Sequence, residues 1–122
     1  MKKVVFSIAA FLLSTILAGA AILLSDSFSY ADGPLVTVSS NLWVHHSGSV
    51  TGEVAVVSGR VLLSETNTED VNALLAGQPY PSSGSTNVFY ACFTVKFTSL
   101  PNSGGTYFAH FKNSSSGYRA RI

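Results

Sequence analysis

The segment from Val88 to Thr98 constrains the fold more than any other part of the chain. Successive residues of an extended chain point to opposite faces. One face would carry Phe89, Ala91, Phe93, Val95 and Phe97, and the other Tyr90, Thr94, Lys96 and Thr98. This alternation predicts a long antiparallel strand with one buried face, and it places Phe93 in the core.

Shorter runs rich in Val, Thr, Phe and Tyr recur along the chain and are broken by Ser, Gly, Asn and Pro, which favours strands. We expect further strands at 27–30, 35–38, 42–45, 52–57, 60–64, 106–112 and 118–122. The last two follow the 88–98 strand through two turns, so these three strands would form a meander. Residues 68–77 are an exception, because they have the features of a short helix: Thr68 could cap its start and Gly77 its end.

The N-terminal segment has the three parts of a secretory signal peptide. Lys2 and Lys3 give a charged start, residues 4–17 are apolar, and small residues at 18–21 suit cleavage after Ala20 or Ala21. A competing reading extends the apolar stretch to Leu24, which gives about 20 residues, enough for an uncleaved membrane anchor. Either way we expect residues 1–20 to act as the signal and residues 25–122 to lie outside the membrane, secreted or in the cell envelope.

Charge and cysteine content exclude some partners. Without Lys2 and Lys3, five basic residues face six acidic ones. Such a balance gives no electrostatic footprint for nucleic acid, and we expect membrane contact only through the N-terminal segment. Cys92 is the only cysteine, so no internal disulfide forms. We expect Cys92 to be a small buried residue of the 88–98 strand, with an intermolecular disulfide or a reactive thiol as the alternative.

The chain ends within a predicted strand. Tyr118, Ala120 and Ile122 alternate with Arg119 and Arg121, and the partner of that strand would be expected downstream. We therefore expect the domain to be incomplete at its C-terminus and to belong to a longer reading frame.

Three segments carry a resemblance to a known family: SDSFSYADGPLVTVSSNLWVHHSG, TEDVNALLAGQPY and FYACFTVKFTSLPNSGGTYFAHFKNSSSGYRARI. They resemble the N-terminal half of the concanavalin A-like lectin/glucanase (laminin-G-like) domain of exported bacterial surface proteins, from about residue 26 to the end. The resemblance implies an all-β fold, an antiparallel jelly-roll or β-sandwich, with a full domain nearly twice as long. It also implies attachment to other surface modules, but it gives little guidance to a ligand.

These features predict a non-catalytic exported surface module that binds a carbohydrate or another envelope component, as in adhesion. A purely structural spacer domain is the alternative, and a glycoside hydrolase of the same fold is the remote one. Trp43 and Tyr80 are the candidates for ligand binding, because aromatic faces pack against sugar rings. Trp43 also lies between Leu42 and Val44 in a predicted strand, which favours core packing.

The hydrolase alternative depends on one short string. Glucanases of this fold carry an E-x-D-x-E strand motif that aims acidic side chains into one cleft. Here the string runs from Glu65 to Glu69, with Asn67 in place of the central aspartate. We therefore expect no catalytic residues and interpret the string as a solvated acidic edge.

Metal sites have weak support in the sequence. His45 and His46 are adjacent and would point to opposite faces of a strand, and His110 adds no ligand spacing, so no transition-metal site is expected. A calcium site is the alternative, because calcium binds carboxylate and amide oxygens. Its candidate ligands are Asp26, Asp32 and Asp70, with Glu69 and Asn72. Asp32-Gly33-Pro34 is equally typical of a turn. No other cofactor is expected.

Overall fold

The computed structural model describes residues 20–81, 83–84, 86–101, 103–115 and 117–122. All of the predicted signal peptide except its last residue, Ala20, lies outside the described residues. Within the described ranges, no helix is long and apolar enough to cross a membrane.

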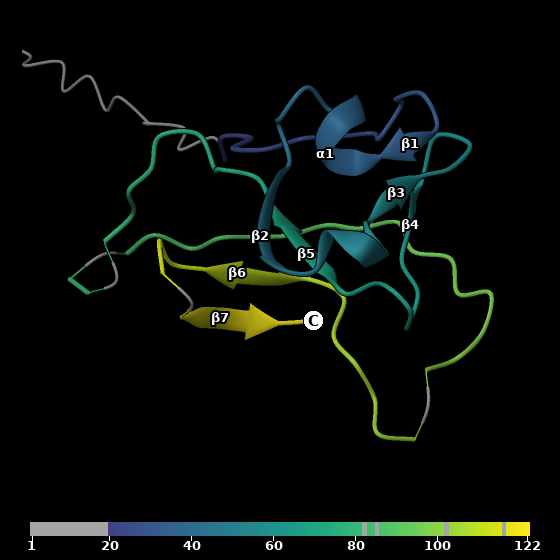
Figure 1. Cartoon of the computed structure of the whole chain (residues 1–122). Helices are drawn as coiled ribbons and strands as arrows, with labels where there is room; N and C mark the ends of the chain where they lie inside the picture. Colours follow the sequence, from purple (N-terminus) through teal and green to yellow (C-terminus); the bar gives the residue numbers. More distant parts are fainter. Residues whose placement is uncertain (1–19, 82, 85, 102, 116) are drawn as a thin grey trace, which may run out of the picture.

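Short strands in small antiparallel sheets make up most of the regular secondary structure of the described residues (Figure 1). The strands are β1 (Gly33–Pro34), β2 (Val44–Gly48), β3 (Ala55–Val56), β4 (Val61–Leu62), β5 (Glu69–Asn72), β6 (His110–Lys112) and β7 (Tyr118–Arg121). One sheet has the order β1-β3-β4, a second pairs β2 with β5, and a third pairs β6 with β7. Among the described residues, helical structure is limited to one α-helical turn, α1 (Leu35–Val38), and one 3-10 turn, Val50–Gly52. This part of the protein is all-β, as predicted.

The core is small and lies between α1 and the first sheet. Its buried apolar residues are Leu35, Val54 and Val56. Partly buried side chains packed against them are Phe28, Tyr30, Val38, Trp43, Val61 and Val71. The backbone N–H of Leu35 donates to the carbonyl of Val54 at 2.8 Å, which ties α1 to the chain just before β3. The best-packed part of the protein therefore lies between residues 28 and 71.

The strand predicted at 35–38 is wrong, because these residues form α1. The N–H of Ser39 donates to the carbonyl of Leu35 at 3.0 Å and closes the single turn. Two β-branched valines and a threonine favour a strand locally. The turn nevertheless places Leu35 in the core with 1% of its surface exposed, and tertiary burial of this kind routinely overrides a weak local preference.

The helix considered for 68–77 is also wrong, because β5 pairs antiparallel with β2. Val44 lies opposite Asn72 and Gly48 opposite Glu69, with a register shift between His45 and Ser47. Thr68 does not cap a helix; its hydroxyl donates to the carbonyl of Ser49 at 3.1 Å. Gly48 has φ +82°, and a Cβ there would lie 1.7 Å from the carbonyl oxygen of Thr68. Only glycine permits this close approach of the two chains.

Residues 27–30 do not form the predicted strand either. Phe28 has a left-handed φ of 54°, and its N–H donates to the Asp26 carboxylate at 2.7 Å. An aspartate that bonds the backbone two residues on forms a local turn, which competes with strand pairing.

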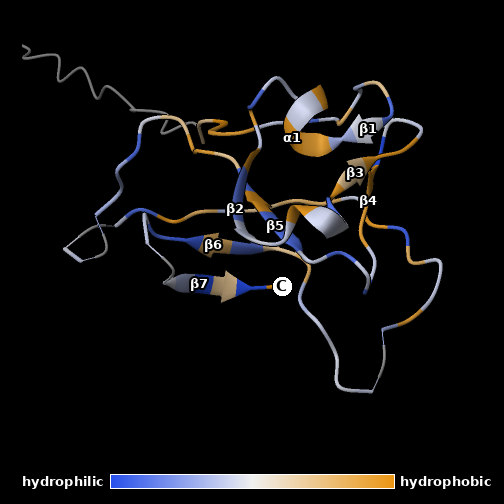
Figure 2. Ribbon diagram, in the orientation of Figure 1, coloured by the Kyte–Doolittle hydropathy of each residue, from blue (hydrophilic) through white to orange (hydrophobic). Residues whose placement is uncertain are grey.

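The 88–98 segment forms no strand with any described residue, so the long strand predicted there is wrong, and the face that the alternation would bury is exposed. Phe93 is 54% exposed and Phe97 is 60% exposed, and Cys92 is exposed as well. Alternation sorts side chains onto two faces, but burial requires a second layer of structure to cover one of them. Hydrophobic stretches along this segment are coloured orange in Figure 2, and the ribbon forms no strand there.

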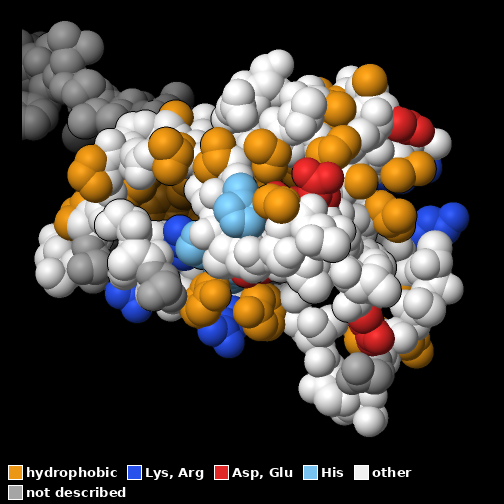
Figure 3. All heavy atoms as spheres, in the orientation of Figure 1, with side chains coloured by type: hydrophobic (Ala, Val, Ile, Leu, Met, Phe, Trp, Pro, Cys, Tyr) orange, Lys and Arg blue, Asp and Glu red, His pale blue; other side chains and the backbone are white. Residues whose placement is uncertain are grey.

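Open space borders the 88–98 segment, and Leu63, Phe89 and Phe108 are among the residues that line it. Hydrophobic side chains gather around a hollow on the face shown in Figure 3. The layer that the Phe residues would need for burial is therefore not supplied by the described residues.

The predicted C-terminal hairpin is confirmed. β6 and β7 pair antiparallel, with Lys112 opposite Tyr118. The Asn113 side chain shapes the turn between them, because its Oδ1 accepts hydrogen bonds from the N–H groups of Ser115 and Gly117, each at 3.0 Å. Aromatic and basic side chains contact one another on this hairpin.

Candidate functional site

Trp43, a candidate for ligand stacking, is held inside the protein by the N-terminal segment. Its Nε1 donates to Oδ2 of Asp26 at 2.7 Å, and the same oxygen accepts from the Tyr30 hydroxyl at 2.7 Å. The indole also packs against Phe28, with ring centroids 5.6 Å apart. The core-packing interpretation of Trp43 is confirmed.

The hydrogen bonds to Asp26 also set its ionisation. Burial of the carboxyl raises its pKa, but the bonds from Trp43, Phe28 and Tyr30 outweigh burial and hold the pKa below its ordinary value of 3.8. The hydrogen bond to Asp26 is the main reason why the pKa of Tyr30 is raised. Asp26 is therefore an ionised structural brace between residues 26–30 and Trp43.

The three calcium candidates lie in separate local networks. Asp32 accepts from the N–H of Ser58 at 2.7 Å, and Asp70 accepts from the Ser47 hydroxyl at 2.6 Å. No group of three or more His, Cys, Asp or Glu side chains that could hold a metal ion occurs among the described residues. Asp26, bound to Trp43, does not join either of the other two.

The two glutamates of the Glu65–Glu69 string lie in different surroundings: Glu69 is buried and Glu65 is exposed. Glu69 is 6% exposed; its Oε2 accepts from the N–H of Val54 at 2.8 Å, and its Oε1 lies 3.2 Å from Nδ1 of His45. Glu65 is exposed in a turn, and Asn67 Oδ1 accepts from the N–H of Ser64 at 2.7 Å. The solvated-edge interpretation is therefore wrong for Glu69, whose carboxylate ties β5 to the core.

His45 and His46 have different partners. His45 contacts Glu69, whereas Nδ1 of His46 accepts from the Lys112 ammonium at 3.2 Å. An ammonium can only donate, so the His46 proton sits on Nε2. That nitrogen is buried and has no partner among the described residues. The Lys112 contact brings the β6–β7 hairpin beside β2.

Tyr80, the second stacking candidate, also packs internally. Its hydroxyl donates to the carbonyl of Ala76. Its ring and that of Phe89 meet edge to face, with centroids 4.7 Å apart and an interplanar angle of 77°. Both aromatic residues predicted as ligand-binding candidates therefore make internal hydrogen bonds and ring contacts.

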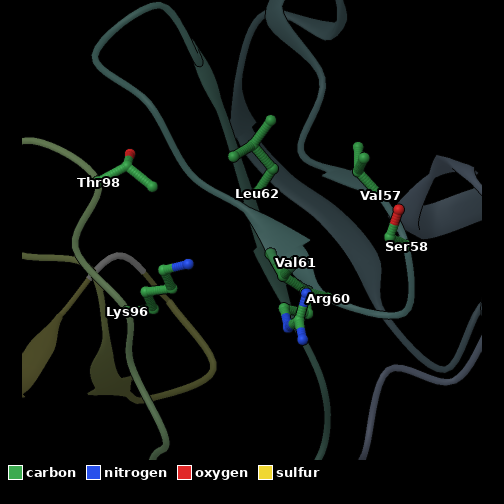
Figure 4. A pocket seen from close by; sticks show the side chains of 7 residues that line it. All are labelled: Val57, Ser58, Arg60, Val61, Leu62, Lys96 and Thr98. Carbon is green, nitrogen blue, oxygen red and sulfur yellow. The ribbon is translucent and has the colours of Figure 1, made fainter.

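A pocket of about 290 Å³ lies beside the β3–β4 turn (Figure 4). Its lining residues are Val57, Ser58, Arg60, Val61, Leu62, Lys96 and Thr98. The Lys96 amine points across the gap toward β4 in Figure 4. None of the lining side chains is aromatic, so the pocket offers no stacking surface for a sugar ring.

The strongest candidate site is a cluster on the C-terminal hairpin, and none of its residues was predicted to bind a ligand. We call Tyr107, His110, Tyr118 and Arg121 the hairpin cluster. The Arg121 guanidinium carbon lies 4.7 Å from the Tyr107 ring centroid and 4.3 Å from that of Tyr118. His110 meets Tyr118 edge to face at 4.6 Å, and the two tyrosine rings are 6.3 Å apart. Tyr107 is 42% exposed, so part of its ring is open to a ligand.

Pairing within the hairpin assembles this cluster. His110 lies opposite Arg121 in the register of β6 and β7, which brings two members together directly. Tyr107 precedes β6, and the adjoining backbone is held by a bond from the N–H of Phe108 to the carbonyl of Ile122 at 2.9 Å. The sequence contained the signal, because aromatic and basic residues occur in both predicted strands of the hairpin. The contact itself depends on the register, which the sequence does not specify.

The charges around His110 are mostly positive. Burial is the largest cause that lowers the His110 pKa from its ordinary value of 6.5; the Asp70 carboxylate opposes it, and His46, Arg121 and Lys112 lower it further. The imidazole is therefore mainly neutral at pH 7. It meets the Tyr118 ring as a neutral aromatic group.

We expect the His110 pKa, measured by NMR titration of the full chain, to lie below 6.5. Asp70→Asn should lower it further, and Arg121→Gln should raise it, because each variant removes one of the opposing charges. A depressed pKa makes His110 contribute stability that is complete above its unfolded pKa of about 6.5. That contribution is lost as the pH falls through the folded pKa. A measured pKa above 6.5, or shifts of the opposite sign in the two variants, would contradict this arrangement.

The chain matches no protein-family model, no curated protein and no solved structure at a significant level. The likeness to concanavalin A-like domains therefore rests on the three sequence segments alone. Function has to be argued from the geometry of the site.

Proposed function

We propose that this chain is a non-catalytic carbohydrate-binding module of an exported surface protein. The observation that carries the proposal is the hairpin cluster, where a partly exposed tyrosine ring lies beside a cation. Aromatic faces pack against the C–H face of a sugar ring, and neighbouring polar groups bond its hydroxyls. The Tyr107 ring and the Arg121 N–H groups supply both kinds of contact.

The proposed fold is the N-terminal half of a jelly-roll β-sandwich, as the sequence resemblance implies. The small antiparallel sheets support it at the level of an all-β fold. The open space beside Phe89 and Phe108 is compatible with further strands packing there in a longer protein. Secretion or display on the cell envelope follows from the proposed N-terminal signal.

The placement of the acidic residues supports a binding role over hydrolysis. Glycoside hydrolysis uses two carboxyl groups that flank one bond of the sugar chain. In the candidate string, the Glu69 carboxylate is committed to Val54 and His45, and Glu65 lies in an exposed turn. The two groups do not face a common ring-binding surface.

The proposal predicts that Tyr107→Ala weakens binding of the full chain to polysaccharides by about tenfold, because it removes the exposed stacking face. Affinity electrophoresis against a panel of neutral and acidic polysaccharides measures the effect. Tyr90→Ala is the matched control, since Tyr90 is 84% exposed and lies outside the cluster. Equal losses in both variants would contradict the assignment of the site. Absence of binding to every polysaccharide would favour a structural spacer.

A further inference from the structure

Arg121 is the unusual member of the hairpin cluster, because its guanidinium lies over two aromatic rings. A cation over a ring face is attracted by the electrons of the ring. The N–H donors of a guanidinium lie in its plane, so a group held by its face keeps donors at its edge for another partner. The guanidinium of Arg121 lies close to both tyrosine rings, and among the described residues its N–H donors have no hydrogen-bond acceptor, so they are available to a ligand.

No acidic side chain pairs with Arg121 among the described residues. Among the described residues, a contact between a carboxylate and a basic side chain joins Glu69 and His45 in the β2–β5 sheet. Residues 106–122 contain Lys112, Arg119 and Arg121 and no Asp or Glu. An exposed group of like charges attracts a ligand of the opposite sign and concentrates it at the surface. The electrostatic complement of the hairpin is an anion.

A bulge in β7 lies directly before Arg121. Arg119 and Arg121 lie opposite Phe111 and His110, which are consecutive, so Ala120 is an extra residue in its strand. Ala120 has a left-handed φ of 42°, an unfavourable conformation for a residue with a Cβ. Bulges often re-aim a side chain at a functional site. Arg121 stacks on the tyrosines, whereas Arg119 makes no ring contact among the described residues.

We propose that the hairpin cluster recognises the carboxylate of an acidic sugar, such as a uronic acid. The edge of the Arg121 guanidinium would donate two parallel hydrogen bonds to the carboxylate, a pairing for which arginine geometry is suited. The exposed face of Tyr107 would pack against the sugar ring that carries it. This inference rests on the proposed carbohydrate-binding function and narrows its ligand class.

The test is isothermal titration calorimetry of the full chain with three probes. The first is an oligomer of galacturonic acid, the second is the same oligomer with its carboxyl groups reduced to alcohols, and the third is polyglutamate, which has carboxylates but no sugar rings. We expect the acidic oligomer to bind about 10- to 100-fold more tightly than either of the others.

Variants of the two arginines provide the matched comparison. Arg121→Gln should lose about 10- to 100-fold in affinity for the acidic oligomer, and Arg121→Lys should recover little, because an ammonium cannot form the paired bonds. Arg119→Gln removes the same charge from the same strand and should change the affinity by no more than about threefold. Melting curves of the three variants identify any loss that comes from unfolding.

The outcomes separate the inference from the function on which it rests. Equal binding of the acidic and reduced oligomers, or equal losses in Arg121→Gln and Arg119→Gln, would overturn the carboxylate assignment and leave carbohydrate binding standing. Polyglutamate binding as tight as that of the acidic oligomer would overturn the sugar component. Failure of all three probes to bind would overturn the acidic-sugar inference, whereas the proposed function would still be decided by the wider polysaccharide panel.

Discussion

Leu35→Ala should destabilise the protein by about 2 to 5 kcal/mol, the range measured for buried leucines. Leu35 is 1% exposed and belongs to a core in which two valines are the other buried apolar residues among those described. With so few buried groups, the surroundings have little alternative packing with which to fill the space left behind. Small domains have only about 5 to 15 kcal/mol of stability in total.

Urea denaturation of the full chain, followed by far-ultraviolet circular dichroism, measures this loss. Leu62→Ala is the control, because it removes the same atoms from a side chain that is 55% exposed in β4. That variant should cost no more than about 1 kcal/mol. Equal midpoints for the two variants would show that α1 does not pack on the first sheet as described.

Leu35 also shows where a sequence-based prediction of this fold fails. The composition of the chain and the alternation in 106–122 were sufficient to predict an all-β protein and its C-terminal hairpin, because these depend on local preferences. The conformation of 35–38 depends on the contact between Leu35 and Val54, which joins segments well apart in the sequence. Local preference alone indicated a strand there.

The strand predicted at 88–98 does not form, although its local pattern is strong. Its alternation is strong, but a pattern of apolar residues states only which side chains could be buried together. Phe93 remains 54% exposed because no described strand covers its face. The prediction of a core position for Phe93 assumed a second layer that the described residues do not supply.

The candidate site was equally dependent on long-range geometry. Trp43 and Tyr80 were chosen as large aromatic residues, yet internal hydrogen bonds and ring contacts occupy both. The cluster of Tyr107 and Arg121 forms because the hairpin register and the bulge at Ala120 bring these residues together. A shift of one residue in register would turn the side chains to the other face, so spacing alone did not identify the site.

Glu69→Ala should destabilise the full chain by about 3 kcal/mol, because the Glu69 carboxylate is buried and hydrogen-bonded. The variant removes a charged acceptor and leaves the buried N–H of Val54 without its partner. Charged hydrogen bonds contribute about 1.5 to 3 kcal/mol, and an unsatisfied buried donor costs about 1 to 3 kcal/mol.

Glu65→Ala is the matched control, because it removes the same charge four residues earlier from an exposed turn. Its urea midpoint should stay within about 0.5 kcal/mol of the original chain. Glu69→Gln should fall between the two alanine variants, since the amide oxygen can still accept from Val54 while the negative charge beside His45 is lost. If Glu69→Ala and Glu65→Ala unfold at the same urea concentration, the Glu69 carboxylate does not connect β5 to the core, and the link between the two N-terminal sheets must lie elsewhere.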